Sequence, residues 1–212
     1  MRELIHKAKP IFIILFLVFV LSYAAGYIAG KLNWTDVQSL QQSPVLKLSS
    51  TLEYKVPGYS QLLRGYKAWH DKCRLGYLFQ KNAWGLGTLF FINNFFVANL
   101  TMFVRALFVL PITLTVFGKF FQGVVFAQAA TGGRTLSIFL LEFGGYFLTI
   151  GATLNLVFWT LLPRAFRFDG RKKALLSGLK LLGLAYLLSG VAILLGSILE
   201  TRFILRFFSG SQ

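Results

Sequence analysis

Two charged side chains lie inside long apolar stretches of this sequence, where ionised groups are costly. Glu142 stands between Leu141 and Phe143, and Lys119 follows Gly118 in an earlier stretch. An acid in hydrocarbon must be neutral, paired or hydrogen-bonded, and a Lys119–Glu142 pair would relieve the cost of both groups. We interpret the pair as a contact that holds helices together. The alternative is a proton or substrate pathway that uses Glu142 near mid-bilayer.

Amides and glycines accompany this acid. Asn93 and Asn94 lie in one apolar stretch, and Asn155 lies in the stretch that holds the acid. In hydrocarbon their amides need partners, so they are expected to form hydrogen bonds between helices. Gly144 and Gly145 follow the acid directly and permit close helix contact or a local break. A break beside a charge is typical of transporters and also of tightly packed bundles.

Residues for soluble-enzyme chemistry are few. His6 and His70 are the two histidines, and neither has the spacing of a zinc site or a protease. The sequence has no phosphate-binding loop and no nucleophile elbow. The lone Cys73 cannot form a disulfide within the chain. No catalytic residue, metal site or cofactor is therefore predicted, and a non-enzymatic role is favoured.

The composition indicates a membrane protein. Of 212 residues, 56% are hydrophobic and 14% are charged, and the mean hydropathy is +0.64. The apolar content exceeds that of an ordinary soluble domain. The apolar residues form runs near the length of about 20 that a helix needs to cross hydrocarbon, without the two-residue period of a β-barrel. The predicted fold is all-α: a polytopic bundle of transmembrane helices.

Five spans are predicted. They cover residues 11–29, 86–104, 106–130, 135–162 and 174–199. The break between the second and third is placed at Arg105, shortly before Pro111, and Pro163 closes the fourth. The chain then divides into an N-terminal anchor span (1–30), an extramembrane segment (31–87), a four-span membrane bundle (88–200) and a C-terminal tail (201–212).

The extramembrane segment contains one helical pattern. Leu62, Tyr66, Trp69 and Cys73 recur at helical spacing, with charged residues between them. The spacing predicts an amphipathic helix, which either lies on the membrane surface or packs on the ends of the bundle.

Basic residues far outnumber acids. The chain has 22 Lys and Arg against 7 Asp and Glu, a formal charge of +15. In a membrane protein such residues bind anionic lipids and set orientation, and because no nucleic-acid motif accompanies them, nucleic acid is not an expected partner. With five spans, the N-terminus, Arg105 and the basic cluster at 164–173 share one side, which is predicted to be cytoplasmic. The alternative has four spans, with a re-entrant segment in 86–130 and both termini inside.

Three segments are similar to the membrane region of a known family. Phe90 to Ala98 reads FFINNFFVA, Gly118 to Val125 reads GKFFQGVV, and Leu141 to Gly145 reads LEFGG and is followed by Gly151-Ala152. Over about residues 90–155 the chain resembles the stage II sporulation protein M family. The resemblance implies a five-span membrane component that acts through partners, with Asn93, Asn94, Gly123 and Glu142 as the matching positions. The family often has Pro-His-Gly before the glutamate, where this chain has Ser137-Ile138-Phe139. The resemblance does not imply a role in sporulation.

Three functions are considered on these grounds. The first is a non-enzymatic integral membrane subunit that scaffolds or anchors a larger complex of membrane proteins, in a bacterial plasma membrane. The second is a transporter or permease-like component that uses Glu142 at membrane depth. The third is an accessory subunit of an energy-converting or pigment-binding complex, indicated by the 17% aromatic content.

Overall fold

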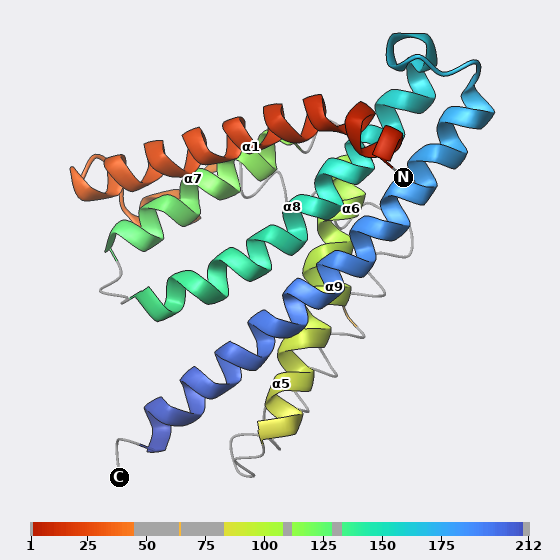
Figure 1. Cartoon of the computed structure of the whole chain (residues 1–212). Helices are drawn as coiled ribbons and strands as arrows, with labels where there is room; N and C mark the ends of the chain where they lie inside the picture. Colours follow the sequence, from red (N-terminus) through yellow and green to blue (C-terminus); the bar gives the residue numbers. More distant parts are fainter. Residues whose placement is uncertain (1, 45–63, 65–82, 108–111, 129–132, 210–212) are drawn as a thin grey trace.

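The computed structural model of the chain describes residues 2–44, 64, 83–107, 112–128 and 133–209. This part is helical and contains no strand, which confirms the all-α prediction. Its elements, in chain order, are α1 (Arg2–Lys31), α2 (Val37–Gln41), α5 (Ala83–Ile92), the π-helix η1 (Asn93–Ala98), α6 (Asn99–Leu107), α7 (Ile112–Gln128), α8 (Gly133–Leu161), the 3-10 helix η2 (Pro163–Phe166) and α9 (Arg171–Ser209) (Figure 1). The predicted amphipathic helix, with Tyr66, Trp69 and Cys73, lies outside the described residues, as does His70.

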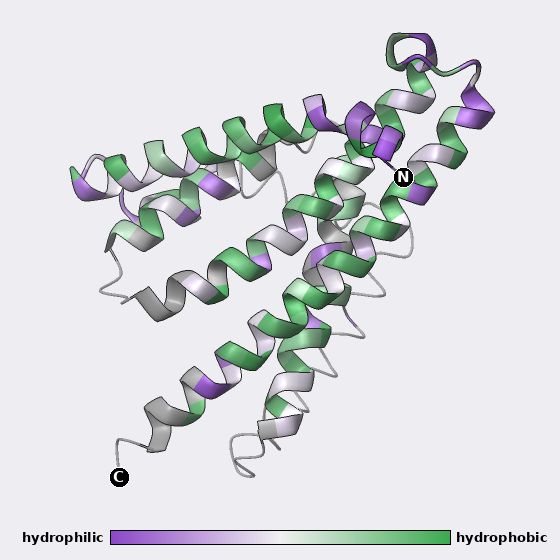
Figure 2. Ribbon diagram, viewed as in Figure 1, coloured by the Kyte–Doolittle hydropathy of each residue, from purple (hydrophilic) through white to green (hydrophobic). Residues whose placement is uncertain are grey.

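Among the described helices, three are long and apolar enough to cross a membrane. They are α1, the Leu140–Leu161 part of α8 and the Arg171–Arg202 part of α9. Apolar residues dominate their length, whereas hydrophilic residues gather at the N-terminus and at the start of α9 (Figure 2). These helices are consistent with an integral membrane protein, as the composition predicted.

The long helices run in alternating directions. α5, η1 and α6 follow one another without a gap and form one rod. This rod runs alongside α9 in the opposite direction, because Gly87 meets Thr201 at one end and Asn99 meets Ser189 further along. α8 also runs opposite to α9, whereas α1 and α7 lie side by side and parallel (Figure 1). The N-terminus lies beside the α8–α9 turn, where Lys7 Nζ donates to the Arg167 carbonyl at 3.2 Å.

Glycines bring α1 and α7 into backbone contact. A Cβ on Gly26 would collide with the Phe120 carbonyl, and a Cβ on Gly123 would collide with the Tyr23 carbonyl. Gly30 lies one turn after Gly26 and packs on Val124. Gly26 and Gly30 form a GxxxG pattern, which allows helix backbones to approach closely in lipid. The predicted site residue Gly123 therefore belongs to a helix contact.

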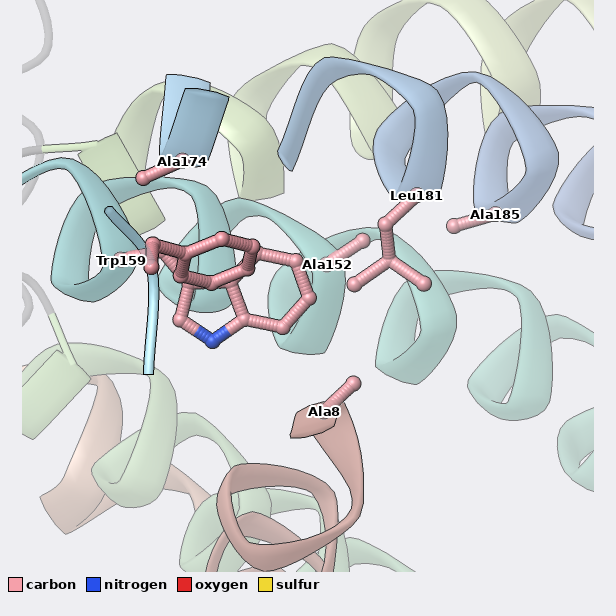
Figure 3. Packing of buried hydrophobic residues seen from close by; sticks show 7 residues of the cluster. Ala8, Ala152, Trp159, Ala174, Leu181 and Ala185 are labelled. Atoms are coloured by element: carbon pink, nitrogen blue, oxygen red, sulfur yellow. The ribbon is translucent and has the colours of Figure 1, made fainter. Parts of the chain in front are cut away.

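A small-residue core joins the end of α8 to α9. Trp159 of α8 is fully buried among alanines and Leu181 of α9, and Ala8 of α1 completes the cluster (Figure 3). The alanines leave room for the large indole, and this close packing ties the start of α1 to the α8–α9 pair.

Helix boundaries agree with the predicted spans in α8 and differ elsewhere. α8 ends at Leu161, close to the predicted stop before Pro163. The break expected at Arg105 is wrong, because α6 continues to Leu107 and α7 begins at Ile112, after Pro111. Arg is a good helix former, so it does not end a helix by itself. α9 continues ten residues beyond the predicted end at 199, because a helix does not have to stop at a membrane boundary.

Candidate functional site

The carboxylate of Glu142 is held by an asparagine of another helix. Asn94 Nδ2 donates to Glu142 Oε1 at 2.5 Å, and Asn93 Nδ2 donates to Asn94 Oδ1 at 3.1 Å. Asn94 is buried, with 9% of its surface exposed. A hydrogen bond to an ionised acceptor is stronger than one between neutral groups. The predicted residues Asn93, Asn94 and Glu142 therefore form one chain of hydrogen bonds between the η1 rod and α8.

A π-helix sets the direction of these amides. In η1 the backbone N–H of Asn99 reaches the carbonyl of Asn94, five residues earlier. Asn99 is fully buried, and its Nδ2 donates to Ser189 Oγ of α9 at 3.0 Å. One wide turn thus connects the rod to α8 through Asn94 and to α9 through Asn99. Short π segments inside helices are frequent at functional sites.

A glycine of α9 makes room for the acid. A Cβ on Gly196 would lie 3.1 Å from Glu142 Cγ. Glu200 lies one turn further along α9 and within range of the charge of Glu142. Tyr146, one turn after Glu142 on α8, lies in the field of both carboxylates. Two acids, a phenol and an amide therefore gather where α8, α9 and the η1 rod meet.

The cluster lies away from the N-terminal end of the bundle. Lys7 of α1 meets Arg167 in the α8–α9 turn at that end, whereas Glu142 lies in the first half of α8 and Glu200 in the last third of α9. The position of Glu142 near mid-bilayer stays a prediction.

Lys119 has other partners. Its Nζ donates to Gln122 Oε1 at 2.8 Å and lies 4.4 Å from the centre of the Phe143 ring and 5.9 Å from that of Phe19. The residue is only 3% exposed. No ion pair joins Lys119 to Glu142 in the described part of the chain, so the predicted pair is wrong. Consecutive residues of a helix point about 100° apart, and α8 turns Phe143 toward α7 and Glu142 toward α9.

Of the other predicted residues, Gly145 and Asn155 are buried in the bundle and Gly144 is not. Gly145 lies against α9, where a Cβ would be 2.9 Å from Ile193 Cγ1, whereas a Cβ on Gly144 would meet nothing within 4 Å. Asn155 is fully buried, but its Nδ2 donates to the Gly151 carbonyl of the same helix at 2.7 Å. The expected hydrogen bond from Asn155 to another helix is therefore replaced by one within α8.

Sequence reasoning missed three features of the site. Glu200 lies directly after the predicted fifth span (174–199), and the sequence pattern gives it no role. Ser189 received no role, although a hydroxyl in an apolar helix is a common hydrogen-bond partner. The π-turn has no sequence signature that a helical pattern reveals. Within the described residues, no group of three or more His, Cys, Asp and Glu side chains is placed to hold a metal.

Comparison with protein-family models, with curated proteins and with solved structures finds no match to this chain.

Proposed function

We propose that the chain is a non-enzymatic integral membrane subunit that scaffolds or anchors a larger membrane complex, and that α1 carries its partner-binding face. The observation that supports this is the uneven burial of the three apolar helices. In the most apolar stretch of α1, 17% of the residues are buried, against 50% in α8 and 39% in α9. Phe16, Leu17 and Leu21 are each more than half exposed on α1. α1 is thus a peripheral helix, packed on α7 and α8 and exposed along its remaining face.

The hydrogen-bonded junction supports a structural role for Glu142 in this proposal. Asn94 and Asn99 tie the η1 rod to α8 and α9, and Gly145 and Gly196 let α9 approach α8 closely. A three-helix unit held together in this way is rigid, and the α1–α7 pair packs against it.

The proposal includes five spans with the N-terminus in the cytoplasm of a bacterium. The directions of α1, the η1 rod, α7, α8 and α9, which alternate along the chain, support it (Figure 1). The N-terminal basic residues and those of the α8–α9 turn lie at one end, as the positive-inside rule requires of a cytoplasmic face.

Site-specific photocrosslinking in native membranes tests the partner face. A photoreactive amino acid at Leu17 should form an adduct with one defined membrane protein. Leu187 of α9, which is 70% exposed, is the matched control and should crosslink only to lipid. Lipid adducts alone at Leu17, together with recovery of the chain without a partner in mild detergent, would contradict the scaffold.

A transporter or permease-like component is the second candidate, and the η1 π-turn beside Glu142 favours it. A π-turn disturbs the regular hydrogen bonding of a helix, and transporters often bind substrates or ions where a membrane helix is locally irregular. Reconstituted protein should then move a substrate across liposomes, and Glu142→Gln should abolish the flux. Flux no higher than in empty liposomes for both proteins would exclude this candidate.

A further inference from the structure

A groove of about 310 Å³ opens between the first half of α1 and the middle of α9, away from the Glu142 junction. Its walls are apolar and include Ile5, Phe12, Leu148, Leu184 and Leu188. Ile5 and Leu188 are 54% and 49% exposed, so the groove opens sideways, toward the surroundings of the bundle. Along α9 the lining runs from Leu181 to Leu188, a rise of about 10 Å, compared with about 15 Å for the hydrocarbon of one leaflet.

Two lysines flank this groove. Lys9 is part of its lining, and Lys180 lies one turn before Leu184 on α9. Both are exposed. Lysine beside an apolar wall extends its ammonium toward the headgroup level, where it acts as a compact positive charge.

The acids at this end of the bundle form ion pairs with other bases. Glu3 pairs with Lys7 at 3.0 Å, and Asp169 pairs with Lys173 at 2.6 Å. The hydrogen bond from Lys173 holds the pKa of Asp169 below its usual range, which keeps this carboxylate ionised and paired. In the described ranges, neither Lys9 nor Lys180 has a carboxylate within ion-pair distance. The groove is thus an apolar channel whose rim carries uncompensated positive charge.

We propose that this groove binds one anionic phospholipid, with an acyl chain between α1 and α9 and its phosphate between Lys9 and Lys180. The apolar walls match the chain, and the two lysines match a headgroup with a net negative charge. The lipid would join α1 to α9, which contact each other at few residues.

Native mass spectrometry of the full-length protein in mild detergent tests the proposal. Phosphatidylglycerol and phosphatidylcholine with the same acyl chains are titrated in parallel. One phosphatidylglycerol should bind in preference to phosphatidylcholine. Since a lysine near the headgroups contributes about 1 kcal/mol, or about fivefold, Lys9→Gln with Lys180→Gln should weaken this binding by about 25-fold.

Matched variants distinguish lipid binding in the groove from lipid binding to the positive charge at this end of the bundle in general. Arg171→Gln with Lys172→Gln removes two exposed bases off the groove and should leave the affinity unchanged. Leu184→Trp should block the groove with both lysines intact, whereas Leu187→Trp on the neighbouring face should not. Equal binding of both lipids would overturn the proposal, as would an equal loss in the Arg171/Lys172 variant. A dimer that forms without lipid and is lost in Leu184→Trp would also overturn it, in favour of a second copy in the groove.

Discussion

Asn94 and Glu142 join two helices through one short hydrogen bond, from Asn94 Nδ2 to Glu142 Oε1 at 2.5 Å. The acid thus obtains a partner from an uncharged side chain instead of a base. This arrangement leaves a net negative charge in the junction when Glu142 is ionised, and Glu200 adds a second acid nearby. The stability of the junction should therefore depend on the amide donor more than on any cation.

Removal of that donor should destabilise the fold. Asn94→Ala leaves a half-buried carboxyl without its partner, which is expected to cost about 1–3 kcal/mol of unfolding free energy. Glu142→Gln keeps an oxygen that can accept the same hydrogen bond, so it should cost less. Thermal unfolding in detergent, followed by circular dichroism, measures both. A loss in Glu142→Gln as large as that in Asn94→Ala would contradict the view that the hydrogen bond is the main role of the acid.

Lys119 and Glu142 should behave as independent residues. Lys119→Met keeps the apolar stem against Phe143, and because Glu142 is bound by Asn94, the acid should be unaffected. In a double-mutant cycle of Lys119→Met and Glu142→Gln, the two changes in unfolding free energy should add to within about 0.5 kcal/mol. Recovery of stability in the double variant would show that the two side chains do form an ion pair.

The sequence predicts helix existence well and side-chain partners poorly. α8 was placed to within two residues at each end, because glycines before it and Pro163 after it are strong breakers. The partner of Glu142 was not predictable, since successive side chains on a helix point about 100° apart and a small rotation of the helix changes which neighbour each one faces. The sequence does not report how α8 is rotated against α7 and α9. The π-turn at Asn93–Ala98 was not predictable either. Tertiary contacts of Asn94 and Asn99 stabilise it, and local propensity does not.

The α1–α7 contact should be sensitive to a single methyl group. In Gly26→Ala or Gly123→Ala the new Cβ would strike a backbone carbonyl of the other helix, so the helices must separate. Overpacking of this kind is expected to cost about 1–3 kcal/mol. Gly118→Ala on α7 is the matched control, because a Cβ there meets nothing within 4 Å and replacement of a helical glycine should raise stability by about 0.5–1 kcal/mol. Similar unfolding temperatures for Gly26→Ala and Gly118→Ala would show that α1 does not pack closely on α7.

The orientation of the bundle can be measured with three single cysteines in a Cys73→Ser background. Gln38 lies after α1, Arg171 begins α9 and Arg202 lies near its end, and all three are exposed. With five spans and a cytoplasmic N-terminus, Gln38→Cys and Arg202→Cys should react with a membrane-impermeant maleimide in intact cells, and Arg171→Cys should react only after the membrane is opened. The four-span alternative places the C-terminus inside and the 164–173 turn outside, so it predicts that Arg202→Cys is protected and that Arg171→Cys reacts. Labelling of Arg171→Cys in intact cells together with protection of Gln38→Cys would reverse the whole orientation, because the basic residues at 164–173 are its main support.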